Sequence, residues 1–313
     1  MPGGGPQGTL LALLLLIVMI NEIGFDGQGT NVGELVTFKR KLKRANEIHL
    51  KFVDDLTLAE SINLPEQLMK VNDKLVLPKQ KSKVNKQLEL IRNQAEENQM
   101  KLNQKKTKIM VFNPCKSLDF HPEISLDGNE LEMVDEMRLL GITIRSDMKW
   151  STNTQNMVKK ASKRLWIIRR LKQLGASTID LVDVYTKQVR CILELAAPAW
   201  QGGISQAEKM DLERVQKCAT HIILGNLYSS YKNALEILDL DSLEFRRNNL
   251  SLKFAVKSEK HLKFKSWFKP TKKTLNTRTQ LPKYCEVRAN SVRFAKSPIS
   301  FLTKLLNLHY KKA

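Results

Sequence analysis

The sequence lacks the cysteine patterns that hold zinc ions or build disulfide frameworks. Its four cysteines lie far apart, and none of them belongs to a C-x-x-C pair. They are Cys115, Cys191, Cys218 and Cys285. Histidine is scarce as well, with 5 in 313 residues. These absences argue against a zinc site and against a small secreted domain, so a reducing compartment is expected.

The sequence also lacks an apolar run long enough to cross a bilayer. The run from Leu10 to Ile20 has eleven residues, whereas a membrane-spanning helix needs about 20. Residues 2–9 carry no positive side chain, which a signal peptide would require. We therefore expect a helix buried on all faces, in a cytoplasmic or nuclear protein without membrane contact. A membrane-anchored basic protein is the alternative that this run leaves open.

Acidic residues are few relative to basic ones. The chain has 52 Lys and Arg against 32 Asp and Glu, which gives a net charge of +20. Between Arg246 and Ala313 there are 18 basic residues and 2 glutamates, so +16 of the +20 lies there. A hydrophobic content of 42% supports a folded core. The charge predicts a polyanionic partner, with nucleic acid favoured over anionic membrane.

Two adjacent carboxylates, Asp54 and Asp55, lie between two short apolar stretches. Strand alternation predicts a hairpin with the aspartates at its turn and four side chains in the core. These four are Leu50, Phe52, Leu56 and Leu58. A carboxylate pair beside a cleft suits Mg²⁺, which takes few protein oxygens and leaves sites for substrate phosphates. An ordinary turn between two solvent-exposed strands is the alternative.

A glycine-containing loop precedes the apolar run, and the aspartate pair follows it. Gly5-Pro6-Gln7-Gly8 leads into the run, and Asp54 comes about 46 residues after Gln7. In this order, the loop and Phe52-Val53-Asp54-Asp55 resemble motifs B and C of a reverse transcriptase. The resemblance is to non-LTR (LINE-type) retrotransposons related to the jockey and CR1 groups. Residues 101–112 resemble motif D, residues 138–142 resemble the primer-gripping hairpin after it, and the resemblance extends to residues 297–299.

The resemblance implies an RNA-directed DNA polymerase that uses an RNA template, a DNA primer and dNTPs. It implies Asp54 as a metal ligand, Asp55 as a weaker or supporting ligand, and Lys108 or Lys106 near the triphosphate. A lysine there would protonate the leaving pyrophosphate or hold phosphate charge. The template base and the incoming nucleotide would then contact the loop formed by Gly5, Pro6, Gln7 and Gly8. A solvated lysine cluster before a strand is the alternative for the two lysines.

The resemblance has one large gap. In this family the aspartate of motif A bridges the two metal ions and lies upstream of motif B, whereas Met1 falls almost on motif B. The sequence is therefore expected to be a truncated, inactive piece that binds Mg²⁺ or Mn²⁺ only if motif A is supplied. In addition, Ala12-Leu13 replaces the usual Gly-Pro and Glu22 replaces the usual Asp. A non-catalytic basic nucleic-acid-binding protein is the competing hypothesis.

The expected fold class is α+β. Residues 1–150 would form a partial polymerase palm, an antiparallel sheet with packed helices. Residues 151–245 would form a helical thumb-like domain, and residues 246–313 a basic C-terminal region. Within the first part, we expect a helix over residues 84–106 with Val84, Leu88, Ile91 and Ala95 on its core face. We also expect a hairpin at Asp127-Gly128 and short strands at 109–112 and 139–144.

Residues 154–174 predict a strongly basic amphipathic helix, followed by helices over 178–195, 205–224 and 239–254. Ala161, Leu165, Ile168 and Leu171 would form the apolar face of the first. Its basic side chains are expected to contact nucleic-acid phosphates, although a solvated face is the alternative. These are Lys159, Lys160, Lys163, Arg164, Arg169 and Arg170, and Lys172 completes the basic set of the helix.

Aromatic residues allow two different roles. Trp166 and Trp200 are expected to be core anchors. Beyond Lys257, five aromatic residues alternate with lysines, which predicts either loose stacking on nucleic-acid bases or a partly disordered tail. They are Phe264, Trp267, Phe268, Tyr284 and Phe294.

Overall fold

The computed structural model is α+β and divides into two compact units. The N-terminal unit runs to Met137 and also takes Arg145–Met148, while the helical unit comprises Arg138–Ile144 and Lys149–Ala313. The structure describes residues 47–52, 55–60, 69–71, 74–76, 83–99, 101–112, 118–119, 122–262, 264–271, 282–286 and 292–312. The boundary between the units therefore falls within the hairpin of β10 (Glu136–Leu139) and β11 (Ile142–Arg145).

Short strands build the N-terminal unit. The strands β1 (Glu47–Phe52) and β2 (Asp55–Glu60) pair antiparallel, which confirms the predicted strand pair. Asp55 begins β2 opposite Phe52, so its predicted place in the turn was wrong. A second sheet contains β3 (Met69–Val71), β4 (Lys74–Val76) and β6 (Leu118–Asp119). In it β4 is antiparallel to β3 and parallel to β6.

The helix α2 (Lys83–Glu97) covers β2 and carries much of this unit's core. Its predicted apolar face is confirmed, because Leu88 and Ala95 are buried. The predicted end of the helix at Lys106 was wrong. The chain leaves the helix after Glu97, where the Asn98 side chain bonds to the Gln94 carbonyl at 2.6 Å and Gln99 adopts a φ of 56°. The surrounding core contains Leu58, Val84, Leu88, Leu102, Ile109, Ile124, Leu126 and Leu131.

Tight turns shape the rest of the N-terminal unit. Asp127 and Gly128, with φ of 51° and 79°, connect β7 (Ser125–Leu126) to β8 (Asn129–Glu130). A two-residue hairpin of this kind needs positive φ at both positions, so the predicted Asp-Gly hairpin is confirmed. The strand predicted at 109–112 is limited to β5 (Lys108–Ile109), which runs parallel to β9 (Glu132–Met133).

The strand predicted over 139–144 is interrupted. Leu140, with a φ of 47°, and Gly141, with a φ of 93°, form the turn between β10 and β11. A left-handed backbone at two consecutive residues cannot continue an extended strand. Residues 138–142, which resemble the primer-gripping motif, therefore lie at this hairpin turn.

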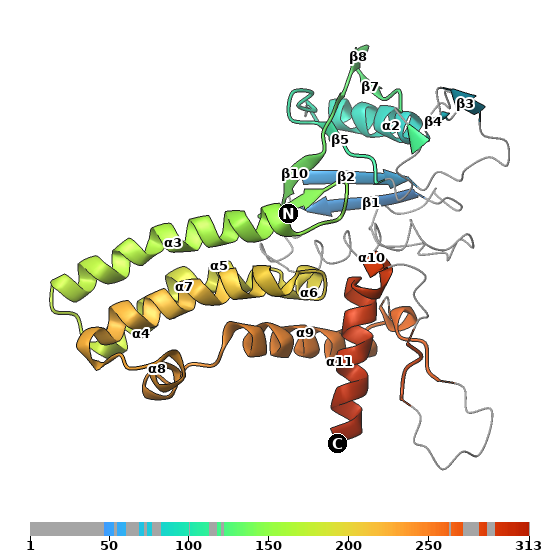
Figure 1. The fold of residues 1–313 in the computed structure, drawn as a ribbon. Helices are drawn as coiled ribbons and strands as arrows, with labels where there is room; N and C mark the ends of the chain where they lie inside the picture. Colours follow the sequence, from blue (N-terminus) through green and yellow to red (C-terminus); the bar gives the residue numbers. More distant parts are fainter. Residues whose placement is uncertain are drawn as a thin grey trace, which may run out of the picture. The chain divides into compact units, whose positions relative to one another are not determined.

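Helices build the second unit (Figure 1). In chain order they are α3 (Ser151–Gln173), α4 (Thr178–Val184), the π-helical η1 (Tyr185–Arg190), α5 (Cys191–Glu194), α6 (Ala197–Trp200), α7 (Gln206–Leu224), η2 (Gly225–Leu227), α8 (Tyr231–Ile237), α9 (Leu243–Lys260), η3 (Lys265–Trp267), α10 (Val292–Ala295) and α11 (Pro298–Lys312). Figure 1 shows α3 running alongside α7, and α11 lying across α9.

Serine side chains start several of these helices where the sequence predicted them. Ser205 forms a capping box with Glu208 at the start of α7, with Glu208 accepting the Ser205 amide at 2.6 Å. Ser242 accepts the Phe245 amide at the start of α9, so the helix predicted over 239–254 begins at Leu243 and extends to Lys260. Ser177 caps α4, and the predicted helix over 178–195 is a continuous run of α4, η1 and α5.

The core of the helical unit is apolar with a few buried polar side chains. The hydroxyl of Tyr185 donates to Oε1 of Gln216 at 2.5 Å, and burial raises the pKa of this tyrosine. Arg247 is fully buried, donates from Nε to Oε1 of Gln201 at 2.7 Å and lies over the ring of Trp200. Trp200 itself is fully buried, so its predicted role as a core anchor is confirmed.

Among the helices that the structure describes, none combines the length and the hydropathy of a membrane span. The apolar run from Leu10 to Ile20 lies outside the described residues.

Candidate nucleic-acid interface

Most of the predicted polymerase site lies outside the described residues. This applies to Asp54 and to the loop of Gly5, Pro6, Gln7 and Gly8. Asp55 is placed by its backbone as the first residue of β2. Among the residues that the structure describes, no group of three or more His, Cys, Asp or Glu could hold a metal ion. Binding of Mg²⁺ or Mn²⁺ at Asp54 and Asp55 therefore stays a prediction.

The two lysines of the predicted triphosphate site differ in their surroundings. The Lys108 ammonium pairs with the carboxylate of Glu132 on the neighbouring strand β9. Lys106 is exposed, and its side chain has no partner in the described part of the chain. The ion pair offsets the charge that Lys108 would offer to a phosphate, whereas Lys106 keeps its charge free. Both predicted roles stay predictions.

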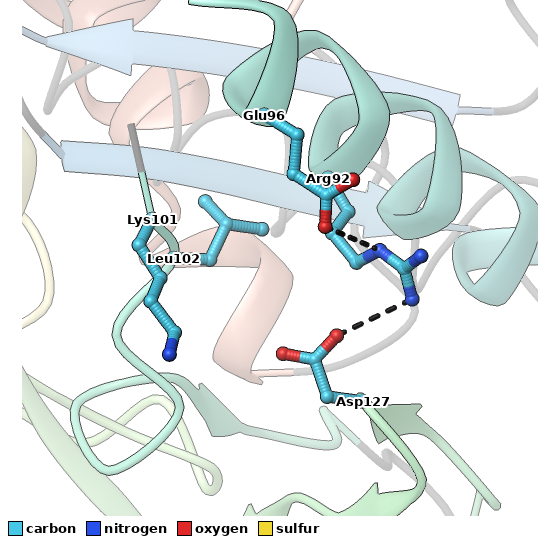
Figure 2. A pocket seen from close by; sticks show the side chains of 5 residues that line it. All are labelled: Arg92, Glu96, Lys101, Leu102 and Asp127. Carbon is cyan, nitrogen blue, oxygen red and sulfur yellow. Dashed lines mark hydrogen bonds and ion pairs between the residues drawn. The ribbon is translucent and has the colours of Figure 1, made fainter. Parts of the chain in front are cut away.

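A small hollow of about 180 Å³ lies in the N-terminal unit between α2 and the Asp127 turn. Figure 2 shows Arg92 placed between two carboxylates, at 3.4 Å from Glu96 and 3.3 Å from Asp127. Lys101 and Leu102 complete its lining. Because Glu96 and Asp127 already balance the charge of the Arg92 guanidinium, this hollow offers no concentrated charge to a ligand.

The helix α3 has two opposite faces. Met157, Ala161, Leu165 and Ile168 are buried at helical spacing, which confirms most of the predicted apolar face. The same helix carries seven basic residues and no acidic residue. At 3.6 residues per turn, Lys159, Lys163 and Arg170 fall on the side directly opposite the buried face. The charge of α3 is therefore concentrated on its exposed side.

Two basic residues of α3 serve the fold. Arg164 is half-buried and donates from Nη1 to the Gln188 carbonyl at 2.8 Å. The Lys172 ammonium donates to the carbonyls of Ile222 and Ile223 at 2.6 and 3.0 Å, at the carboxyl end of α7. A cation there is favoured by unpaired carbonyls and by the helix dipole. A Cβ on Gly225 would meet the Lys172 Nζ at 2.6 Å, so the glycine gives the ammonium its space.

The other basic residues of α3 make few or no interactions with the described part of the chain. Lys159, Lys160, Lys163 and Arg169 are exposed and make no ion pair or hydrogen bond in the described part of the chain. Arg170 makes only a long hydrogen bond, at 3.4 Å, to Gln173. We define the basic stripe as Lys159, Lys163, Trp166 and Arg170, which follow one another at intervals of four, three and four residues.

Trp166 belongs to this stripe and not to the core. Its side chain is 65% exposed, so the expectation that it anchors the core was wrong. The physical reason is its position on the helix, three residues after Lys163 and four before Arg170. The apolar periodicity of Ala161, Leu165 and Ile168 already excludes it from the buried face, and this signal could have placed it correctly.

Unlike Trp166, the aromatic residues of the C-terminal region are mostly buried. One of the two roles predicted for these residues, stacking on nucleic-acid bases, was wrong for four of them, because Phe264, Trp267, Phe268 and Tyr284 are buried. The rings of Phe264 and Trp267 lie 4.8 Å apart, and those of Phe268 and Tyr284 lie 5.7 Å apart. Each ring thus packs against another ring of the same region, and the fifth aromatic residue, Phe294, is half-buried.

A carboxylate holds this C-terminal cluster together. Glu259 on α9 accepts hydrogen bonds from Tyr284, from Lys283 at 2.8 Å and from Tyr310 at 2.6 Å. Burial acts to raise the pKa of Glu259, but the three hydrogen bonds and the lysine charge outweigh it and lower the pKa. Burial and the bond to Glu259 raise the pKa of Tyr284 to about 12. We call Glu259, Lys283, Tyr284 and Tyr310 the C-terminal cluster.

No family model matches the sequence, and neither a curated protein nor a solved structure matches it. The chemistry of the chain's own residues must therefore carry the functional inference. Among the described side chains, the exposed side of α3 concentrates unpaired positive charge on one rigid element. Rigid elements place a binding surface more precisely than loops do.

Proposed function

We propose that the helical unit binds the phosphate backbone of nucleic acids through the exposed side of α3. The observation that carries this proposal is the set of basic side chains that have no partner among the described residues, on a helix without acidic residues. Four buried residues on the other side hold the helix in place, so the charges point outward on a fixed support. Phosphates are the ligands that such a surface attracts most strongly.

The dimensions of the stripe fit several phosphates. Lys159 and Arg170 are eleven residues apart, which is about 16 Å along a helix. Phosphates of one B-form strand repeat every 3.4 Å or so along the axis, so about five fall within this length. Lys160 and Arg169 flank the stripe on its two sides. Binding should therefore weaken steeply with salt, by about 0.7 to 0.9 in log K per log salt for each phosphate.

In line with the sequence resemblance, we propose that this binding serves a reverse transcriptase of the non-LTR retrotransposon kind. Its ligands would be an RNA template, a DNA primer and dNTPs, with Mg²⁺ or Mn²⁺ at Asp54 and Asp55. The strand pair that sets Phe52 opposite Asp55 supports this proposal, because motif C needs an antiparallel hairpin there. The N-terminal unit would then be part of the palm, and the helical unit would serve as the thumb.

Charge reversal on two matched helices tests the binding proposal. The full chain would carry Lys159→Glu, Lys163→Glu and Arg170→Glu, and its affinity for a labelled 30-nucleotide RNA would be measured by fluorescence anisotropy. The control carries Lys253→Glu, Lys257→Glu and Lys260→Glu, three exposed lysines on α9 that change the net charge equally. We expect a loss of about a hundredfold or more for α3, a salt slope lower by about three, and a much smaller loss for α9. Equal losses would contradict the proposal.

Primer extension tests the polymerase proposal separately. The chain would be combined with a fingers and motif A segment from a related element, and extension would be compared with and without Asp54→Asn. We expect that substitution to lower extension by about a thousandfold or more, because one metal ligand is lost, while RNA affinity stays unchanged. Extension that ignores Asp54→Asn would refute the proposed metal site. Binding without extension under every condition would support the non-catalytic nucleic-acid-binding protein.

A further inference from the structure

Trp166 is exposed in surroundings that are almost entirely basic. Its neighbours along the helix, at three and four residues, are Ser162, Lys163, Arg169 and Arg170. In the described part of the chain, no other ring and no cation packs against its indole. The ring therefore lies open to solvent between cations on both sides along the helix.

The other three tryptophans of the chain are all buried. Trp150 and Trp267 are 6% and 7% exposed, and Trp200 is fully buried. A single exposed apolar side chain is ordinary on a protein surface and would carry no inference by itself. The basic side chains on either side of Trp166 make its exposure informative, because a flat ring between cations matches the alternation of bases and phosphates in a nucleic acid.

We propose that Trp166 is a stacking platform for an unpaired nucleobase, so that the basic stripe prefers single-stranded nucleic acid. This proposal rests on the proposed function, since it needs the stripe to bind phosphates. Lys163 and Arg170 contact phosphates on either side of the base that covers the indole. Every base has a flat face, so the contact tolerates any sequence.

The shape of the site favours a single strand over a duplex. In a duplex each base is stacked between its neighbours, and a ring on the convex side of a helix cannot reach a base face. In a single strand the bases can turn outward and stack on a protein ring while the backbone follows the charges. The phosphates of a duplex would still meet Lys159 and Arg170, but the indole would add little to its binding.

The same surroundings disfavour a protein partner. The centres of protein interfaces are depleted of charge and rich in apolar contact area. Here one ring is surrounded by Lys163, Arg169 and Arg170, none of which pairs with an acid in the described chain. Bringing those charges against an apolar partner surface would remove their water without compensation.

Tryptophan fluorescence can test this directly in the full chain. Because Trp166 is the exposed tryptophan, a stacked base should quench its emission selectively, and Trp166→Phe should abolish that quenching. A 20-nucleotide oligo(rU) serves as the single-stranded probe, and a 20-base-pair duplex serves as the comparison. We expect Trp166→Ala to weaken oligo(rU) binding about tenfold or more, Trp166→Phe to weaken it less, and both to leave duplex affinity and the salt slope unchanged. Phe245→Ala, which removes an exposed aromatic side chain from α9, is the matched control and should change nothing.

Each other outcome has a definite meaning. If Trp166→Ala binds oligo(rU) normally while charge reversal on α3 abolishes binding, the stacking proposal is overturned and the proposed function stands. Equal weakening for single strand and duplex would overturn it as well. Failure of the wild-type chain to bind either probe at low salt would reject the proposed function and this proposal together. Self-association that depends on Trp166 without nucleic acid, seen by sedimentation, would assign the ring to a protein interface instead.

Discussion

The helix α3 and the residues around the C-terminal cluster are both rich in lysine and carry aromatic side chains. In α3 the indole of Trp166 is exposed and Lys163 has no partner in the described structure. In the C-terminal region, by contrast, Trp267 and Tyr284 are buried, and Lys283 is bonded to Glu259. Similar compositions thus produce one surface with free charges and an open ring, and one region in which rings and charges hold the fold together.

The difference follows from what each region packs against. The described neighbours of α3 cover only its apolar side, so no described part of the helical unit lies against its basic side. The helices α9 and α11 contact each other, and the segment with Tyr284 is tied to both, through Glu259 and Asn307. A basic, aromatic-rich sequence therefore indicates nucleic-acid binding only where the tertiary fold leaves its side chains unpartnered.

The largest expected effect is a loss of stability when the buried tryptophan of the C-terminal region is removed, compared with removal of the exposed one in α3. Trp267→Ala should lower the free energy of unfolding by about 3–5 kcal/mol, because it leaves a cavity among packed rings. Trp166→Ala should change it by less than about 0.5 kcal/mol, as expected for an exposed position. Denaturant unfolding followed by circular dichroism would measure both. Comparable losses of stability for the two variants would contradict the conclusion that one ring is exposed and the other supports the fold.

The carboxylate of the C-terminal cluster should make that region sensitive to acid. The pKa of Glu259 is lower in the folded protein than in the unfolded chain. The ionised carboxylate therefore stabilises the fold fully above about pH 4.3, the ordinary pKa of a glutamate. This stabilisation is lost as pH falls through the lower folded pKa. Glu259→Gln should remove this dependence and lower the free energy of unfolding at neutral pH by about 1–3 kcal/mol, because Lys283, Tyr284 and Tyr310 all lose their charged acceptor.

Amide hydrogen exchange would follow that loss locally. The amide of Cys285 donates to the Lys269 carbonyl at 2.8 Å, and the amide of Thr271 donates to the Lys283 carbonyl at 3.0 Å. Both should lose protection, relative to the intrinsic exchange rate at the same pH, in Glu259→Gln and in the wild type at low pH. The amide of Leu165 in α3 serves as the internal control and should keep its protection. Unchanged protection at Cys285 would show that Glu259 does not hold the segment.

The smallest expected effect separates two lysines of the same helix. Lys172→Met should reduce the free energy of unfolding by about 1 kcal/mol, since the end of α7 loses its cation, and RNA affinity should stay the same. Lys163→Met should do the reverse, with a salt slope lower by about one and unchanged stability. Denaturation and anisotropy on both variants provide the measurement. A loss of binding in Lys172→Met equal to that in Lys163→Met would contradict the division of roles on α3.

Local sequence signals predicted the helical unit well. The helix predicted over 205–224 matches α7, which begins after its cap Ser205, whereas the helix predicted from 239 begins only after its cap Ser242. Asp127-Gly128 predicted its hairpin because few other dipeptides accept positive φ at both positions. These signals work because the energy that decides the conformation comes from residues within one turn of each other.

Contacts between residues far apart in the chain determine which rings and basic side chains are buried, and these contacts could not be predicted from the sequence. The ring of Tyr284 is buried through contacts to Glu259 and Tyr310, which lie far away in the chain. In the same way, Lys172 looks like its basic neighbours until α7 places two carbonyls beside it. Which bases and rings remain free therefore depends on the packing of distant elements. The predicted metal ligand Asp54 and the loop from Gly5 to Gly8 lie outside the described residues, so that part of the site remains a prediction.

The central claim, that α3 is the nucleic-acid surface, is tested most directly by footprinting of lysines. The full chain would be acetylated briefly with and without excess oligo(rU), and modification would be read at each lysine by mass spectrometry. We expect strong protection of Lys159 and Lys163, with little change at the exposed α9 lysines Lys253 and Lys257. Protection of the α9 lysines with Lys159 and Lys163 left reactive would contradict it.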